Sequence, residues 1–192
     1  MKKIAIPFAG IGILLLGLFL SSGLLPSYGQ NPESFCSERR FPPEIRKMVL
    51  DKFPGWRVKT NEDLDPNHQM LWQQNRFMEC PGIARGHFTG FKEEDFGLML
   101  IPDSPDRKGF KILVISFRGK ARHPVLFVLR EESNQDQERF VVYQAPKGKY
   151  SDFRLKNEIE LLREGIAVED LEMGSSLYYW NKNRFERLDL VR

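Results

Sequence analysis

Three apolar runs in the middle of the chain constrain the fold more than any other feature. They span residues 96–101, 112–117 and 125–129, and nearly every position in them is apolar, rather than every second one. Such runs are typical of strands that are covered on both faces. The links between them, PDSPDRKG and RGKAR, are short and rich in turn formers or charge, so we expect antiparallel neighbours in a meander. A fourth strand is predicted at residues 140–143.

An amphipathic helix is predicted ahead of these strands. In the run PPEIRKMVLDKF, Ile45, Val49 and Phe53 recur at fourfold spacing. The prolines at the start of the run suit the first turn of a helix. The Pro-Gly pair after Phe53 ends the helix, because proline disfavours helical geometry in the residue before it. An extended segment is expected next, at residues 56–58.

The remaining elements complete an α+β prediction. A weaker helix is expected after residues 63–66, with an apolar face at Met70, Leu71, Gln74 and Phe77. Residues 151–165 fit a helix or a strand, and we interpret them as strand or irregular structure, with an extended segment at 166–171. Strands at 177–180 and 184–191 predict a closing hairpin. The fold expected is an N-terminal helical segment packed on a mostly antiparallel β-meander, with a C-terminal β-hairpin.

The first 29 residues have the pattern of an export signal. Two lysines follow Met1, residues 4–25 carry no charge, and Ser27 and Gly29 place a cleavage site before Gln30. The alternative is an uncleaved membrane anchor, since the uncharged run approaches the roughly 20 residues that span a bilayer. The expected organisation is a signal peptide at 1–29 and a single globular α+β domain at 30–192, in a secreted or periplasmic protein.

Charge and cysteine content narrow the partners and the compartment. The chain has 29 Lys and Arg against 26 Asp and Glu, and the signal accounts for two of the lysines. A balance this even gives no general attraction to a phosphate backbone, so no nucleic-acid partner is expected. In an oxidising compartment, Cys36 and Cys80 are predicted to form a disulfide; the alternative is two buried free thiols.

A short glycine-bracketed motif carries the one family resemblance. Gly-His-Phe-Thr-Gly at residues 86–90, followed by Asp95 and Phe96, resembles a single FG-GAP or VCBS-type repeat, whose usual form is Gly-Asp-Phe-Asn-Gly-Asp-Gly and then Asp before an aromatic residue or Leu. With the Phe-Pro-Gly-Trp helix ending at residues 53–56 and the Tyr-Tyr-Trp strand at 178–180, the chain also resembles a family of small exported bacterial proteins of unknown function. The resemblance implies a compact exported domain with no known activity. A single copy argues against a propeller.

The motif is not expected to bind a metal, because Asp95 is its one charged donor. Its early positions hold His87, Thr89 and Phe91, whereas calcium requires several carboxylate oxygens. A zinc site from His87, His123 and Asp95 is the alternative, but the three histidines of the chain, of which His68 is the third, lack the spacing of a paired metal site. We predict no metal site and no cofactor.

No catalytic set is expected either. Cys80 with His87 is a candidate nucleophile pair, but Cys80 is better explained by a disulfide. The carboxylates at 93–95 fit a solvated turn, and so do the basic residues Arg118, Lys120 and Arg122 and the acidic link at 131–138. The aromatic run at 178–180 fits cross-strand packing, with a sugar-stacking platform as the alternative.

The function predicted is therefore a non-catalytic exported domain that binds a protein or another component of the bacterial envelope. It would touch a membrane only if the N-terminal segment stays uncleaved. The alternatives are a small envelope hydrolase that uses His87, His123 and nearby carboxylates, and a membrane-tethered structural subunit.

Overall fold

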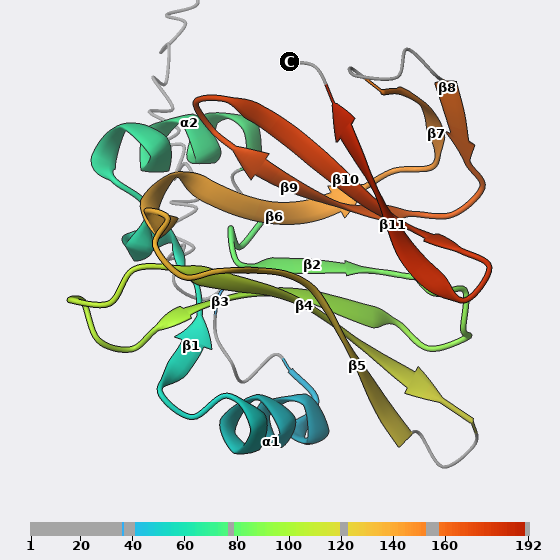
Figure 1. The fold of residues 1–192 in the computed structure, drawn as a ribbon, viewed down its shortest axis with the longest axis horizontal. Helices are drawn as coiled ribbons and strands as arrows, with labels where there is room; N and C mark the ends of the chain where they lie inside the picture. Colours follow the sequence, from blue (N-terminus) through green and yellow to red (C-terminus); the bar gives the residue numbers. More distant parts are fainter. Residues whose placement is uncertain (1–35, 37–40, 77–78, 120–122, 153–157, 191–192) are drawn as a thin grey trace, which may run out of the picture.

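The computed structural model describes Cys36 and residues 41–76, 79–119, 123–152 and 158–190 (Figure 1). These residues form mostly antiparallel strands with two α-helices, which confirms the α+β class at that level. The helices are α1 (Pro43–Lys52) and α2 (Pro66–Arg76), and the 3-10 helices are η3 (Asn61–Asp63) and η4 (Gln137–Arg139). The strands are β1 (Trp56–Val58), β2 (Ile83–Gly86), β3 (Asp95–Pro102), β4 (Phe110–Arg118), β5 (His123–Glu132), β6 (Phe140–Ala145), β7 (Gly148–Ser151), β8 (Glu158–Leu161), β9 (Gly165–Asp170), β10 (Gly174–Asn181) and β11 (Arg184–Leu190).

Nine of the described strands form two sheets that face each other, and β7 and β8 form a separate two-stranded sheet (Figure 1). Sheet A has the order β1-β3-β4-β5, with β2 also paired with β3, and sheet B has the order β11-β10-β9-β6. The predicted meander is correct for β3, β4 and β5 but wrong for the next strand. β6 leaves sheet A and pairs with β9, because the apolar inner face of sheet A needs a second layer to cover it.

The core between the sheets explains why the central strands are apolar on both faces. Met99 of β3 and Ile112 and Val114 of β4 point inward and meet Val142 and Val168 of sheet B. Successive side chains of a strand point to opposite faces, so the neighbours of these residues face away from sheet B. Those outward-facing side chains therefore need a cover of their own.

Helix α1 supplies that cover. Ile45 and Val49 are buried against Leu98, Leu100 and Leu113 on the outer face of sheet A, and the helix lies below that sheet in Figure 1. The predicted helix is thus present, and it ends before Phe53 as expected. The predicted extended segment after it is β1, which pairs with β3.

Helix α2 covers part of the outer face of sheet B, but through a different face from the one predicted. Trp72 is buried against Val141 and Leu171, whereas Met70 and Leu71 are 54% and 40% exposed. Trp72 offers a larger apolar surface, and its indole N–H finds a partner in the carbonyl of Glu79 at 3.0 Å. Phe77 lies outside the described residues.

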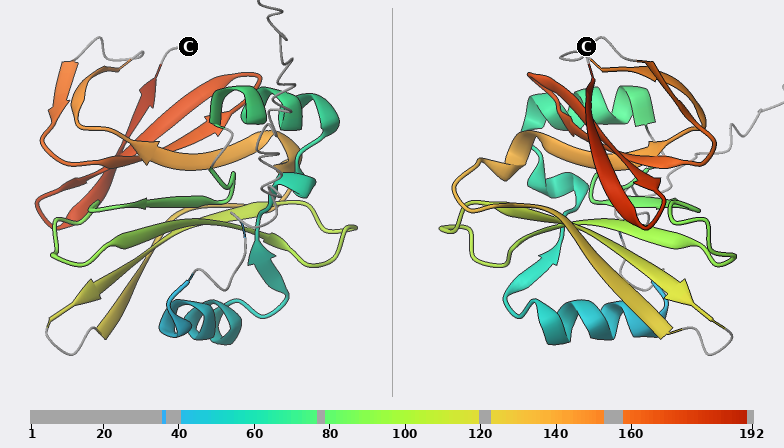
Figure 2. Two further views of the ribbon diagram at one scale, coloured as in Figure 1. Left: turned by 180° about the vertical axis from the view of Figure 1, so that it is seen from behind. Right: turned by 45° about the vertical axis from the view of Figure 1, so that its right-hand side comes forward.

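The C-terminal predictions agree with the structure where it is described. β10 and β11 form the expected hairpin. In the right-hand view of Figure 2 the hairpin lies above β4 and β5. The segment at 151–165, which fitted a helix or a strand, contains β8, and β8 pairs with β7. Residues 153–157 lie outside the described part.

The predicted signal at residues 1–29 also lies outside the described part of the chain. Within the described part of the chain, neither helix has the length and apolar character to cross a membrane.

Candidate functional site

The predicted metal loop is organised around a buried carboxylate. Asp95 is 0% exposed, and its Oδ2 accepts hydrogen bonds from the backbone N–H of Thr89 at 2.7 Å and from the Thr89 hydroxyl at 2.9 Å. The hydroxyl of Ser116, on β4, donates to Oδ1 at 2.5 Å. Burial raises the pKa of the Asp95 carboxyl above its usual value, against these hydrogen bonds. Both carboxylate oxygens of Asp95 therefore already accept hydrogen bonds from other groups of the chain.

Packing holds the rest of this loop in place. Phe88 is buried in the core between the sheets, and Gly90 adopts a φ of +74°, which favours glycine. The guanidinium of Arg163 lies against Gly90 and donates to the carbonyl of Thr89 at 3.2 Å. A Cβ at position 90 would displace that guanidinium, which is the end of a flexible side chain, so it is the backbone conformation that favours glycine here.

The histidines do not join Asp95 in an open site. His87 is exposed, and the carboxylate of Glu164 accepts a hydrogen bond from its backbone N–H at 2.7 Å. His123 is exposed at the start of β5, and His68 is buried on α2 beside Asp65. Among the described residues, no group of three or more His, Cys, Asp or Glu is placed to hold a metal ion. Glu94, one of the carboxylates at 93–95, pairs with Arg85 at 2.6 Å.

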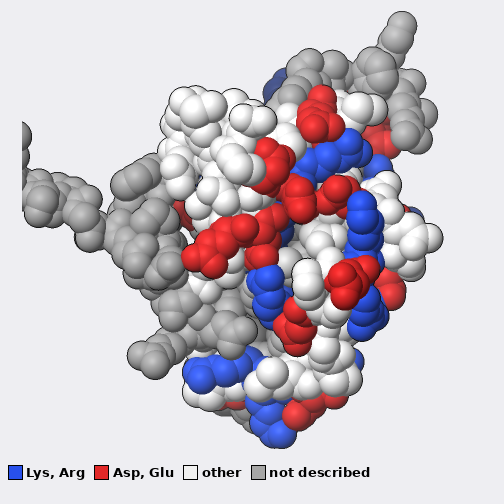
Figure 3. Space-filling view, turned by 90° about the vertical axis from the view of Figure 1, so that its left-hand side faces the viewer, with Lys and Arg blue, Asp and Glu red and all other residues white. Residues whose placement is uncertain are grey.

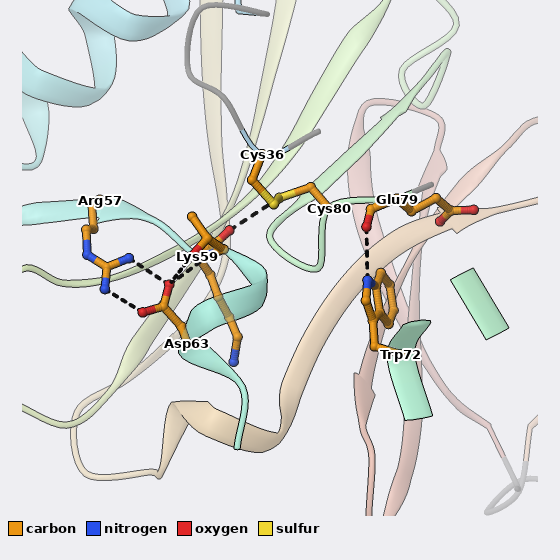
Figure 4. The surroundings of a disulfide bond; sticks show 8 residues. Cys36, Arg57, Lys59, Asp63, Trp72, Glu79 and Cys80 are labelled. Atoms are coloured by element: carbon orange, nitrogen blue, oxygen red, sulfur yellow. Dashed lines mark hydrogen bonds and ion pairs between the residues drawn. A yellow bond between two sulfur atoms is a disulfide. The ribbon is translucent and has the colours of Figure 1, made fainter. Parts of the chain in front are cut away.

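The cysteines lie where they were expected. The Sγ atoms of Cys36 and Cys80 are 2.13 Å apart, which is compatible with the predicted disulfide and with an oxidising compartment. The backbone carbonyl of Lys59 lies 3.5 Å from the Cys80 sulfur, and Figure 4 shows the Lys59 side chain running away from the sulfur pair. The sequence analysis did not single out Lys59. Its ammonium is buried and donates to the carbonyl of Gln137, and burial lowers the pKa of Lys59 to about 7.

Charges on the surface are interspersed. The face shown in Figure 3 carries acidic and basic side chains in close alternation. Ion pairs of the described residues include Arg57 with Asp63 at 2.5 Å and Arg139 with Asp170 at 3.0 Å. This face therefore offers no extended field of one sign that would attract a polyanion.

An open groove lies between β5 and the β10–β11 hairpin. Phe127 of β5 and Phe185 of β11 line it, and the ring of Trp180 of β10 packs against both of them. Their centroids are 5.0 to 5.5 Å apart and the rings are nearly perpendicular, a favourable edge-to-face geometry. All three are only partly buried.

Trp180 and Phe185 are the cross-strand pair expected of the hairpin. The contact of Phe127 with this pair was not predicted. The groove is lined by Leu126, Phe127, Leu129, Arg130, Phe185 and Arg187, among others.

One wall of this groove is a free sheet edge. In the described part of the chain, β5 pairs with β4 on one side and is the last strand of sheet A on the other. Half of the backbone N–H and C=O groups of such a strand point away from the sheet. Val128, in the middle of β5, is 53% exposed. The groove thus combines exposed aromatic surface with unpaired backbone groups.

Comparison of the chain with protein-family models, with curated proteins and with solved structures found no match. The fold and the groove define the class: a domain of two facing antiparallel sheets with a covering helix on each outer face, and with an open edge where the sheets separate. Function is therefore argued from this surface and its chemistry.

Proposed function

We propose that the chain is an exported, non-catalytic interaction domain that binds its partner through the groove between β5 and the β10–β11 hairpin. The observation that carries the proposal is the cluster of Phe127, Trp180 and Phe185 beside the free edge of β5. Aromatic residues are enriched at the centres of protein interfaces. A free strand edge adds main-chain hydrogen bonds for an extended segment of a partner.

Export is part of the same proposal. It is supported by the N-terminal pattern, by the resemblance to small exported proteins and by the paired cysteines. We propose that the signal is removed before Gln30 and that residues 30–192 act in the periplasm or outside the cell. Mass analysis of the purified protein tests this, since a chain recovered in the membrane fraction with residues 1–29 attached would favour the tethered subunit.

The hydrolase alternative has less support. It requires an accessible carboxylate near His87 and His123, and the carboxylate of Asp95 is buried and hydrogen-bonded to Thr89 and Ser116. An interaction role needs no catalytic group, so it agrees better with the groove.

Site-specific photo-cross-linking in the native cells tests the interaction role. A benzophenone amino acid replaces Val128, at the groove edge, and in a matched control it replaces Leu162, which is 79% exposed in the turn after β8. We expect a discrete covalent adduct from position 128 and none from position 162. Absence of any adduct at 128, or the same adduct from both positions, would contradict the proposal.

A further inference from the structure

We propose that the partner of β5 is the same strand of a second copy of this chain, so that sheet A continues across a two-fold axis. This inference rests on the proposed function, because it names the partner of that surface. A sheet extended in this way pairs the outward backbone groups of β5 with those of an identical strand.

The distribution of side chains along β5 leaves its middle open to pairing. The strand has ten residues, and residues 125–128 are apolar and carry no charge. Edge strands are usually protected from pairing by charged residues, proline and bulges. Here these protective features stand at the ends: Pro124 at the beginning, and the register shift together with residues 130–132 at the other end. The exposed Val128 lies between them.

Charge favours an identical strand in antiparallel orientation. One end of β5 is basic, because His123 is paired in register with Arg118 of β4. The other end carries Arg130 followed by Glu131 and Glu132, so its net charge is negative. Antiparallel pairing about a two-fold axis sets the basic end of each copy beside the acidic end of the other, whereas parallel pairing would set like charges together. Within the chain, Glu131 pairs with Lys111, and Glu132 pairs with Arg130 at 2.8 Å, so the added attraction is modest.

Apolar burial would supply the main stabilisation. Phe127 lies near the middle of the strand, close to where a two-fold axis would pass, and its ring already contacts Trp180 and Phe185. Antiparallel pairing at this point brings the two aromatic clusters together and removes part of their exposed surface from water. A strand-to-strand contact is smaller than the roughly 1,600 Å² of a standard interface, so we expect a weak dimer.

Cysteine cross-linking tests the geometry. Cys36 and Cys80 lie at disulfide distance from each other, so a Val128→Cys variant carries a single reactive thiol. In an antiparallel pair centred near residue 127, the two introduced thiols fall within reach of a short bis-maleimide, because diagonal neighbours across strands are about 7 to 8 Å apart. We expect a covalent dimer from Val128→Cys and little from the control Leu162→Cys, which is more exposed, at 79% against 53%, but lies outside the groove.

Sedimentation of the unmodified chain supplies the second measurement. We expect a monomer–dimer equilibrium at protein concentrations up to about 1 mM, a range suited to a small interface. Val128→Lys places a charge in the middle of the free edge, where the two copies would repel each other. We expect it to weaken the dimer by at least about tenfold, which is about 1.4 kcal/mol of association free energy, while circular dichroism and melting temperature stay unchanged.

Each outcome separates this inference from the proposed function. A monomer at every concentration without a cross-link at position 128, or equal cross-linking at 128 and 162, would overturn the second-copy inference. If photo-cross-linking at 128 then captures a different protein, the groove is still an interaction site and only its partner was misidentified. If position 128 captures nothing, both proposals fail.

Discussion

The side-chain ammonium of Lys59 donates a hydrogen bond to the backbone carbonyl of Gln137, 78 residues further along the chain. Lys59 directly follows β1, and Gln137 begins η4 in the link between the two sheets, so the bond ties the start of the domain to this link. The side chain is 0% exposed, and the nearby carboxylates of Asp63 and Glu138 only partly offset its loss of water. Burial therefore lowers the pKa of Lys59 to about 7.

This buried lysine makes stability depend on pH. The folded-state pKa of about 7 lies below the unfolded value of 10.5, so the stabilising contribution is present above pH 10.5 and is lost as the pH falls to 7. Between pH 7 and pH 9 we expect the free energy of unfolding to rise by about 2 kcal/mol from this group. Lys59→Met should remove the rise and be the more stable protein at pH 7, because it buries no charge.

Urea unfolding at pH 7, 8 and 9 measures this effect. Lys52→Met is the matched control, since Lys52 is exposed at the end of α1 and its removal should leave the slope unchanged. A Lys59→Met protein that kept the slope of the parent chain would show that Lys59 is not the group responsible.

The cysteine pair should stabilise the domain by constraining the unfolded chain. Cys36 and Cys80 are separated by 44 positions, and closing a loop of this length contributes about 4 kcal/mol in the chain-entropy model, as an upper value. We expect the double variant Cys36→Ala, Cys80→Ala to unfold at a lower urea concentration than the parent. Labelling of the unfolded, unreduced parent with a thiol reagent should find no reactive cysteine, and two reactive thiols would refute the pairing.

The elements that could be predicted are those whose pattern is local. Period-two and unbroken apolar runs indicated β3, β4 and β5, and fourfold spacing at Ile45 and Val49 indicated α1. The position of β6 could not be predicted, because Phe140 and Val142 would present the same inward face beside β5 as they do beside β9. A pattern shows which face of a strand is buried, but not which strand lies next to it.

The candidate site depends on contacts between distant parts of the chain. Phe127 and Trp180 have no common pattern in the sequence, and only the stacking of the two sheets brings their rings within 5.3 Å. Lys59 follows a short strand, and its sequence context is that of a surface residue. In the folded chain it is buried and bonded to Gln137 of η4, a contact with a distant segment that no local pattern shows.

The prediction of a solvated turn at 93–95 is wrong for Asp95, which is buried. Its hydrogen-bond partner Ser116 lies inside an apolar run, and the sequence pattern of that run indicates only a strand.

The network around Asp95 should contribute strongly to stability. In Asp95→Ala, the backbone N–H of Thr89 and the hydroxyls of Thr89 and Ser116 lose their buried acceptor. We expect a loss of about 3 kcal/mol, since each buried polar group without a partner costs about 1 to 3 kcal/mol. Asp95→Asn keeps an acceptor oxygen and the side-chain volume, so it should cost less. Equal unfolding midpoints for both variants would contradict this account.

The same network predicts how the loop responds to acid. Because the folded pKa of Asp95 is raised, protonation of this carboxyl adds stability that is fully present below the unfolded value of 3.8 and is lost as the pH rises through the higher folded value, whereas the hydrogen bonds to Thr89 and Ser116 remain. Asp95→Asn does not titrate, so its loss of stability relative to the parent should be larger at pH 3.5 than at pH 6. Urea unfolding at these two pH values measures the difference, and a difference of the opposite sign would show that hydrogen bonding outweighs burial at this carboxyl.

Calcium should leave the stability of the domain unchanged, although the loop has the outline of a calcium site. The Asp95 oxygens already accept hydrogen bonds from Thr89 and Ser116, and a cation would have to displace these donors. Calcium binds through about six to eight oxygens, several of them carboxylate, and the early loop positions hold His87, Thr89 and Phe91 instead. We expect the same melting temperature in excess chelator and in millimolar calcium. A rise with calcium that is lost in Asp95→Ala would mean that the loop rearranges to offer this carboxylate to the ion, because a ligand that binds the folded state raises its melting temperature.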